Sequence, residues 1–192
     1  MFSKMKILNA TLICFLFMVQ HLVAQDTLIR RNSIYFELGG NALLYSINYD
    51  RTFRLNDNLK LAPRVGFMYL PPDRSSDFKI FPQMTNIPLE LNLLLGKSTG
   101  SSTFAEVGFG LNYISYSDGY TSRENDARPE EHIVKGVVTT ARLGFRHQKP
   151  AGGIMYRLGM LVPLSRDRRS MVYTGDDIFP TLWGGFSLGY AF

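Results

Sequence analysis

The C-terminal sequence Thr181-Leu182-Trp183-Gly184-Gly185-Phe186-Ser187-Leu188-Gly189-Tyr190-Ala191-Phe192 alternates large and small residues. Successive side chains of a β-strand point to opposite faces, so this segment predicts a strand with one large apolar face. A soluble strand would turn that face inward. The chain offers no core large enough for all the faces like it, so we expect the large residues to face lipid. The alternative is an edge strand of a soluble β-sandwich.

Seven further segments show the same period of two, and no helical period competes with them after the N-terminal region. The clearest is Ile87–Leu95, where isoleucine and leucine occupy every second position. Pro63 is unfavourable within a predicted strand, because proline lacks the backbone N–H that donates a hydrogen bond to the neighbouring strand. The eight predicted strands are Ser33–Asn41, Tyr45–Phe53, Leu59–Tyr69, Ile87–Leu95, Thr103–Tyr113, Val134–His147, Gly153–Leu164 and a last one from about Phe179.

The connections between these segments alternate in length. Those after the third, fifth and seventh strands run to roughly 13 to 20 residues, and most others to about five, an asymmetry typical of membrane barrels with short periplasmic turns and long extracellular loops. The first connection, 41–44, is short where a long loop is expected. The longest, Ser115 to Ile133, is polar and acidic, and we expect it to be the most exposed part of the protein.

The N-terminal segment has the layout of a secretory signal peptide. Lys4 and Lys6 precede an apolar run from Ile7 to Val19, and small residues follow at Ala24. The run is too short for a membrane-spanning helix. We therefore divide the chain into a signal peptide, residues 1–25, and one barrel domain, residues 26–192. Cys14 is the only cysteine, so the mature chain would contain no disulfide and no thiolate metal site.

Charge and hydropathy limit the classes of protein to which the chain can belong. The formal net charge is +5, and it falls to +3 without Lys4 and Lys6. The basic residues lie among acids rather than in a stripe, which disfavours nucleic acid as a partner. The mean hydropathy of −0.04 is low for a helical membrane protein and ordinary for a barrel with alternating residues.

The final strand resembles the C-terminal assembly signal of bacterial outer-membrane β-barrels. The matching residues are Phe186, Leu188, Tyr190 and Phe192, and Ser187 stands where that signal usually has glycine. The whole mature chain resembles the small eight-stranded barrels of the OmpA, OmpX and OmpW type and barrels of that size encoded by Bacteroidota. The resemblance implies residence in the outer membrane with periplasmic termini. It also implies contact with outer-membrane lipid and lipopolysaccharide, and with the barrel-assembly machinery during biogenesis. It identifies no surface partner.

Alternation sends nine charged side chains to the predicted lumen, four acids and five bases that nearly cancel. An eight-stranded barrel is only just wide enough for its own side chains, so opposite charges there should pair. We expect Arg142 to bridge Glu90 and Glu106. This favours a plugged lumen; the alternative is a narrow channel for small solutes. A soluble calycin-like barrel would place these charges outside. The nine residues are Glu37, Asp50, Lys60, Arg64, Glu90, Glu106, Arg142, Arg146 and Arg157.

Catalysis has one weak candidate. His132, beside Glu130 and Glu131 and with Ser115 and Ser117 across the predicted hairpin, offers the residue types of an acyl hydrolase that modifies lipid A: a serine, a histidine and a carboxylate. The barrel lipid A deacylases carry a His-x-Ser pair on one strand, which this chain lacks. No residues have metal-ligand spacing, and we predict no cofactor. The sequence therefore predicts an integral outer-membrane barrel with a structural or surface-interaction role and no enzymatic activity.

Overall fold

The computed structural model describes residues 32–71, 83–97, 102–119, 131–166 and 181–192. The predicted signal peptide, residues 1–25, lies outside these ranges, as do residues 120–130 of the predicted acidic connection. The elements are β1 (Asn32–Gly39), the 3₁₀ turn η1 (Gly40–Ala42), β2 (Tyr45–Arg51), β3 (Phe53–Arg54), β4 (Leu59–Leu70), β5 (Met84–Leu95), β6 (Thr103–Gly119), β7 (Glu131–Gln148), β8 (Gly153–Arg166) and β9 (Trp183–Ala191). Among the described residues, no helix is long and apolar enough to span a membrane.

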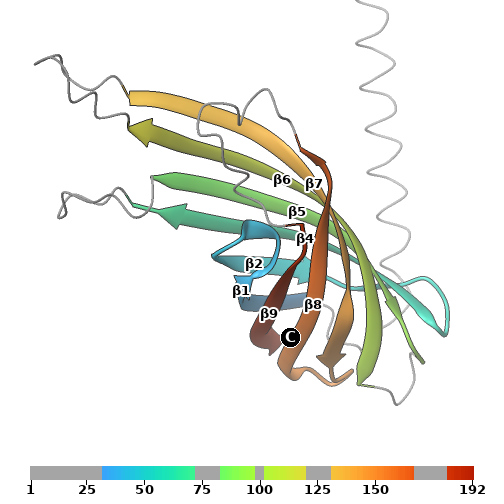
Figure 1. The fold of residues 1–192 in the computed structure, drawn as a ribbon. Coiled ribbons are helices and arrows are strands. Elements are labelled where there is room, and N and C mark those ends of the chain that lie inside the picture. The colour runs from blue at the N-terminus through green and yellow to red at the C-terminus, as the bar shows by residue number, and fades with distance from the viewer. Residues whose placement is uncertain (1–31, 72–82, 98–101, 120–130, 167–180) are drawn as a thin grey trace, which may run out of the picture.

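The strands form one closed antiparallel barrel (Figure 1). Their order is β2-β1-β9-β8-β7-β6-β5-β4-β3, and β2 also pairs with β4, which closes the circle. The first strand pairs with the last, from Ser33 opposite Ala191 to Gly39 opposite Gly185. A closed barrel has no free sheet edge at which another chain could add. The prediction of an all-β, antiparallel, eight-stranded barrel is confirmed once β2 and β3 are counted as one strand.

Pro63 accounts for the interruption between β2 and β3. Asp50 pairs with Arg64 and Phe53 with Leu61, so the register is the same on both sides of the gap. Within this gap Arg51 would stand opposite Pro63 and Thr52 opposite Ala62, but no pairing with β4 is formed there, whereas Pro63 still pairs with Leu91 on the other side. Because proline has no backbone N–H, it cannot donate to the neighbouring strand at this point. The predicted strand Tyr45–Phe53 is therefore one strand with a local break.

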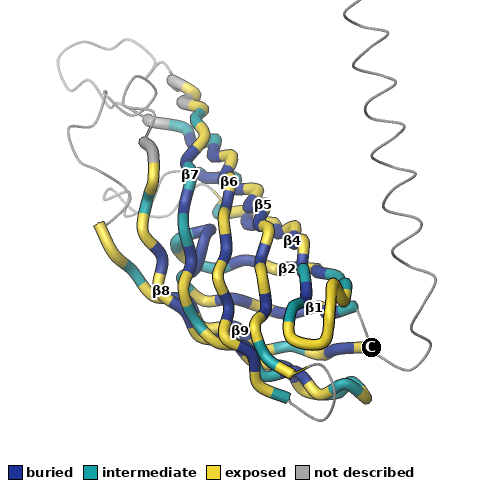
Figure 2. Tube along the Cα trace, turned by 90° about the vertical axis from the view of Figure 1, so that its right-hand side faces the viewer, coloured by how far each residue is buried: buried dark blue, intermediate teal, exposed yellow. Residues whose placement is uncertain are grey.

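Exposed and buried residues alternate along every strand, as Figure 2 shows by colour. In β5 each buried residue is followed by one that faces outward, and the outward residues from Ile87 to Leu95 are all apolar and exposed. The outward faces of β1, β4, β6, β8 and β9 are likewise apolar over most of their length. An apolar outer wall around a polar interior is the inverse of a soluble barrel, and it is what a lipid environment requires.

β6 and β7 are longer than the sequence predicted. Their register runs unbroken from Thr103 opposite His147 to Gly119 opposite Glu131, and both strands extend far toward the end from which the long connections leave (Figure 1). Ser115–Gly119 and Glu131–Ile133 are therefore strand, not loop. The polar residues Ser115 and Ser117 alternate with buried residues, and this outward polar face has the composition of a loop. The last strand also begins later than predicted, at Trp183.

Candidate functional site

The interior of the barrel holds a network of three arginines and three glutamates. Arg64 contacts Glu37, and its Nη1 lies 2.8 Å from Oε2 of Glu90. Arg142 Nη2 lies 2.8 Å from Glu37 and 3.1 Å from Glu90. Arg157 Nη2 lies 3.2 Å from Glu90 and 3.0 Å from Glu106. Glu90 thus contacts all three guanidinium groups, and every side chain in the network is almost fully buried.

A second, separate ion pair lies beside this network. Arg146 donates from Nη1 to Asp50 Oδ2 at 2.7 Å and from Nη2 to Oδ1 at 2.9 Å. Two parallel bonds from one guanidinium to one carboxylate form the strong fork geometry. Arg146 Nη2 also donates to Ser33 Oγ at 3.0 Å. Both members of the pair are fully buried. With this pair included, four acids match four arginines, and the buried Lys60 adds a fifth base.

Neutral side chains complete the network. Asn48 Oδ1 accepts from Arg64 Nε at 3.0 Å, and Ser187 Oγ donates to Glu37 Oε1 at 3.2 Å. The phenol oxygen of Tyr35 accepts from Arg157 Nη1 at 2.8 Å. The Tyr35 ring also lies 5.5 Å from the guanidinium carbons of both Arg64 and Arg157, a cation–π distance. A buried guanidinium needs such additional partners, because its desolvation can exceed the attraction of a single pair.

The short first connection folds into the barrel as η1 and forms a layer next to the charges. Gly40, Asn41 and Ala42 are all fully buried or nearly so. Four side chains from four different strands hold this turn in place. Asn86 Nδ2 donates to the Ala42 carbonyl at 3.3 Å, Asn112 Nδ2 to the Asn41 carbonyl at 2.5 Å, Thr140 Oγ1 to Asn41 Oδ1 at 2.8 Å, and Trp183 Nε1 to the Gly40 carbonyl at 2.6 Å.

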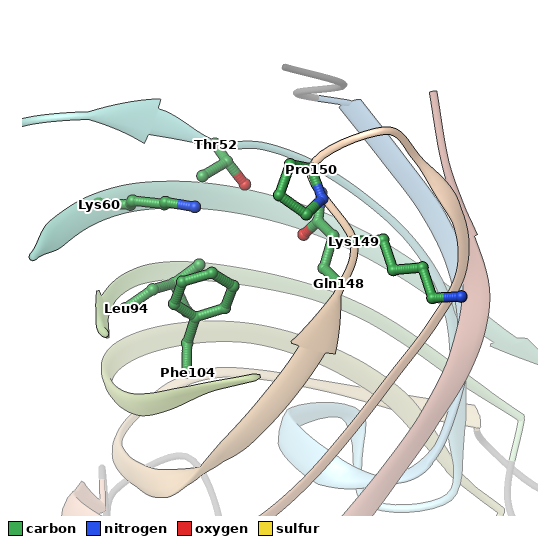
Figure 3. Close-up of a pocket in the computed structure, with 7 residues that line it drawn as sticks. All are labelled: Thr52, Lys60, Leu94, Phe104, Gln148, Lys149 and Pro150. Atoms are coloured by element: carbon green, nitrogen blue, oxygen red, sulfur yellow. The ribbon is translucent and has the colours of Figure 1, made fainter. Parts of the chain in front are cut away.

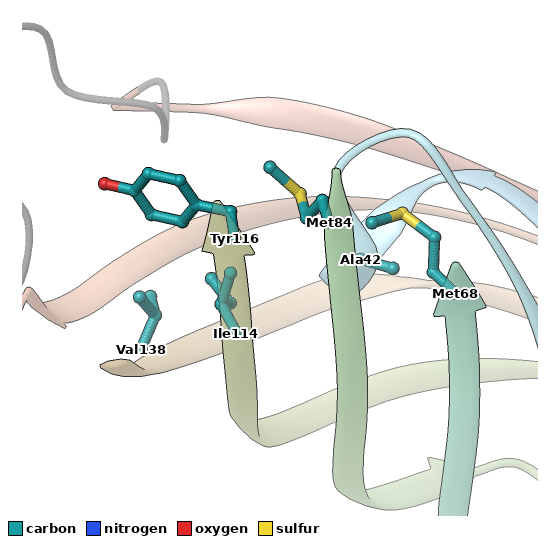
Figure 4. Packing of buried hydrophobic residues seen from close by; sticks show 6 residues of the cluster. All are labelled: Ala42, Met68, Met84, Ile114, Tyr116 and Val138. Atoms are coloured by element: carbon teal, nitrogen blue, oxygen red, sulfur yellow. The ribbon is translucent and has the colours of Figure 1, made fainter. Parts of the chain in front are cut away.

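An apolar layer lies beyond η1, toward the long connections. It consists of Ala42, Met68, Met84, Ile114, Tyr116 and Val138, which come from η1, β4, β5, β6 and β7 (Figure 4). Met68 and Val138 have no exposed surface. Methionine side chains are flexible and fill irregular gaps, which suits a site where strands converge on a turn. This layer extends the packed interior beyond the charged network.

The opposite mouth of the barrel, at the end where β1 begins and β9 ends, is also packed. Ala62, Leu94 and Phe104 form a small buried apolar cluster. The Lys60 ammonium lies 4.1 Å from the centre of the Phe104 ring. The hollow that remains among these residues and the turn at Lys149 and Pro150 has a volume of about 10 Å³ (Figure 3). That is no more than the space that one water molecule needs.

All nine charged residues predicted for the lumen lie inside the barrel, but one predicted pairing is wrong. Arg142 bridges Glu37 and Glu90, whereas Glu106 contacts Arg157. Opposite Arg142 on β6 stands Gly108, and opposite Glu106 on β7 stands Gly144. Arg142 and Glu106 are therefore offset by two residues along the paired strands. The long side chain of Arg142 reaches across the lumen to Glu37 and does not pair with Glu106. Neither the role of Tyr35 nor the burial of η1 was predicted; the inward position of Tyr35 in the alternation of β1 is the signal that the sequence offers.

The residues of the predicted assembly signal lie on the outer wall of β9. Phe186, Leu188, Tyr190 and Phe192 are all exposed. The backbone N–H of Phe192 donates to the Asn32 carbonyl at 2.8 Å, which joins the last residue to the first strand. The candidate for catalysis gains no support from the pairing, because His132 stands opposite Asp118 rather than opposite Ser115 or Ser117. Within the described ranges, no group of three or more His, Asp or Glu residues is suited to hold a metal ion.

The closed wall, the apolar outside and the charged interior define the class: an eight-stranded barrel of the outer-membrane type. Comparison with solved structures agrees. The N-terminal β-barrel domain of OprF from Pseudomonas aeruginosa is similar with a TM-score of 0.52 at 12% identity, over 84% of this chain and 96% of that one. A major outer membrane protein from Thermus thermophilus is similar with a TM-score of 0.53 at 17% identity, over 84% and 98%. The chain therefore has the OmpA-like outer-membrane barrel fold. No protein-family model and no curated protein sequence matches it.

Proposed function

We propose that this protein is an integral outer-membrane barrel with a structural or surface-interaction role and a lumen closed to solutes. One observation carries the proposal: the apolar outer wall encloses an interior that is packed at successive levels. These levels are the apolar mouth at the end where β1 begins and β9 ends, the ion pairs, η1, and the apolar layer toward the long connections. A solute would have to displace all of them.

The balance of charge supports a plug rather than an ion path. A selective pore needs binding that is weak enough for the ion to leave. Here each carboxylate already contacts one or more guanidinium groups, and an entering ion would separate buried charges at a cost of several kcal/mol. A narrow channel is the second candidate, and a lipid A-modifying hydrolase the third.

Conductance across a planar bilayer is the direct test of the plug. The folded wild-type protein should give no stepwise conductance, and folding is verified on a gel by a shift in mobility between unheated and boiled samples. Repeated, concentration-dependent conductance steps from protein that shows this shift would favour the channel. A deletion strain with altered lipid A acylation, measured by mass spectrometry, would favour the hydrolase.

We further propose that the termini and short turns are periplasmic and that the long connections face outward from the cell. The predicted mature chain has no cysteine, so a single introduced cysteine can report its own position. Ser117→Cys should react with a membrane-impermeant maleimide on intact cells. Lys149→Cys, at the exposed β7–β8 turn, should react only after lysis. The reverse pattern would invert the orientation, and labelling of both on intact cells would contradict residence in the membrane.

A further inference from the structure

The described interior of the barrel carries one more positive than negative charge. Its buried acids are Glu37, Asp50, Glu90 and Glu106, and each contacts one or more of the four buried arginines. The fifth buried base is Lys60 of β4, which is 5% exposed and lies at the mouth where β1 begins and β9 ends. Because burial of a charge is costly unless opposite charge lies nearby, this mouth should attract an anion.

Polar groups from separate parts of the chain converge beside Lys60. Thr52, Lys60 and Gln148 line the hollow of about 10 Å³, and in Figure 3 their polar ends point toward one another. Each of these residues is more than nine-tenths buried. The hydroxyl of Thr52 has no hydrogen-bond partner within the described ranges. Since a buried hydroxyl that stays unpaired is destabilising, its presence here indicates a group that binds from outside the chain.

The rim around this hollow is also positively charged. Lys149 lines the hollow and is exposed, and Lys97 is exposed on the turn after β5 at the same end. Asp57, the acid in the turn before β4, already pairs with Arg54. The described part of the rim therefore produces a positive potential, which would draw an anion toward the mouth.

We infer that this mouth binds the terminal carboxylate of a peptide. The hollow has room for one oxygen atom, because its volume is about that of one water molecule. The Lys60 ammonium would bind this oxygen in a charge-assisted hydrogen bond, and the Thr52 hydroxyl would donate a second bond. A carboxylate also supplies the single negative charge by which the described interior falls short, whereas a phosphate group carries up to twice that charge.

The rest of the ligand would stay at the open rim, because Leu94 and Phe104 close the mouth toward the lumen. A peptide tolerates the water there, whereas the acyl chain of a fatty acid would leave apolar surface exposed. In the proposed orientation this mouth opens to the periplasm, so the peptide would arrive from that side. The site requires no passage through the lumen and is compatible with a closed barrel.

Saturation-transfer NMR of the full mature protein, folded in a neutral detergent, tests the inference. The probe is acetyl-triglycine with a free carboxylate, and the control ligand is the same peptide with a C-terminal amide. Wild-type protein should transfer saturation to the last glycine of the acid, and the amide should bind about tenfold more weakly, in line with the loss of one charged hydrogen bond. Acetate should displace the acid peptide at a lower concentration than inorganic phosphate does.

Three variants separate a binding role from a structural one. Lys60→Met keeps an apolar stem against Phe104 but removes the charge, so the dissociation constant should rise about tenfold. Thr52→Val has nearly the same shape and should weaken binding about threefold. It should not lower stability in urea unfolding, because the hydroxyl has no described partner to lose. Lys135→Gln, an exposed lysine of β7 toward the opposite end, is the matched control and should bind as wild type does.

Two outcomes would overturn the inference: equal binding of the acid and the amide by wild-type protein, or equal binding of the acid by Lys60→Met and Lys135→Gln. The gel-mobility shift confirms that each variant is folded. Displacement by phosphate at a lower concentration than acetate would contradict the assignment to a carboxylate. Conductance and membrane fractionation test the proposed function separately, so a closed barrel in the outer membrane that binds no peptide would leave that function standing.

Discussion

Removal of Arg146 should destabilise the barrel more than removal of any exposed arginine. Arg146 and Asp50 form a fork of two bonds at 2.7 and 2.9 Å, and neither side chain has exposed surface. Arg146→Met would leave the Asp50 carboxylate buried without its cation. Such a loss costs about 3–5 kcal/mol when the surroundings are dry. Water that entered the lumen would reduce this value.

The chain provides a matched control in the pair of Arg54 and Asp57. Their side chains are 35% and 81% exposed; Arg54 is the last residue of β3, and Asp57 lies three residues later in the turn before β4. Exposed pairs of this kind contribute about 0–1 kcal/mol. Arg54→Met should therefore have little effect. Both variants remove an arginine that pairs with an aspartate, so the difference between them isolates the effect of burial.

Urea unfolding in lipid vesicles, followed by the fluorescence of the single tryptophan, Trp183, measures both free energies. Adding Asp50→Asn to Arg146→Met should recover part of the loss, so the double variant should be more stable than the sum of the two single effects by about 2 kcal/mol. The reasoning would be refuted by effects of Arg146→Met and Arg54→Met that are equal and small, or by additive effects at Arg146 and Asp50. Either result would mean that water solvates this pair.

Two other predictions concern the network and the last strand. Glu106→Gln should show strong coupling to Arg157→Met and weak coupling to Arg142→Met in double-mutant cycles, because Arg157 lies 3.0 Å from Glu106 and Arg142 contacts other acids; the opposite order would contradict the described pairing. Phe192→Ser should sharply reduce the amount of protein in the outer membrane while secretion continues, because Phe192 ends the exposed row of β9; fractionation that finds normal membrane levels would remove its role in assembly.

The wall of the barrel could be predicted from the sequence because a strand has a strict period of two. The inward orientation of Glu37 and Arg157 follows directly from their places between outward apolar neighbours. Partners across the lumen could not be predicted in the same way. Glu37 and Arg142 are separated by 105 residues, and their contact depends on how the strands are staggered when the barrel closes. Within the described network, only Arg64 and Glu90, which stand opposite each other on β4 and β5, form a pair that the strand order alone would suggest.

The two main differences from the sequence prediction have separate physical causes. The polar residues Ser115 and Ser117 have the composition of a loop, but Ile114 and Tyr116 continue the period of two, so the segment is strand. The first connection was predicted as an exception, short where a long loop is expected, but its burial inside the barrel was not predicted. Its burial depends on Gly39 and Gly40, which have φ values of +67° and +65° and turn the chain back into the barrel. A pair of adjacent glycines at the end of a strand indicates an unusual turn, but it does not give the direction of that turn.

Gly40 is therefore the residue at which η1 and the ion network can be tested together. A Cβ at Gly40 would overlap the carboxylate of Glu37. That carboxylate cannot move aside easily, because Arg64 and Arg142 hold it. Gly40→Ala should cost about 1–2 kcal/mol for the left-handed backbone and about 1–3 kcal/mol for the overpacking.

Gly153 is the matched control, since its φ is +108° and nothing lies within 4 Å of a Cβ placed there. An alanine strains the backbone at both positions, and the strain at Gly153 is no milder because its φ lies further from the region that alanine tolerates. Gly40→Ala should nevertheless be the more destabilising in urea unfolding, because it alone meets the fixed carboxylate. Addition of Glu37→Gln should not rescue it, since the glutamine occupies the same space. If Gly40→Ala were as stable as Gly153→Ala, η1 would not lie packed against Glu37, and the layer that it forms across the lumen would be absent.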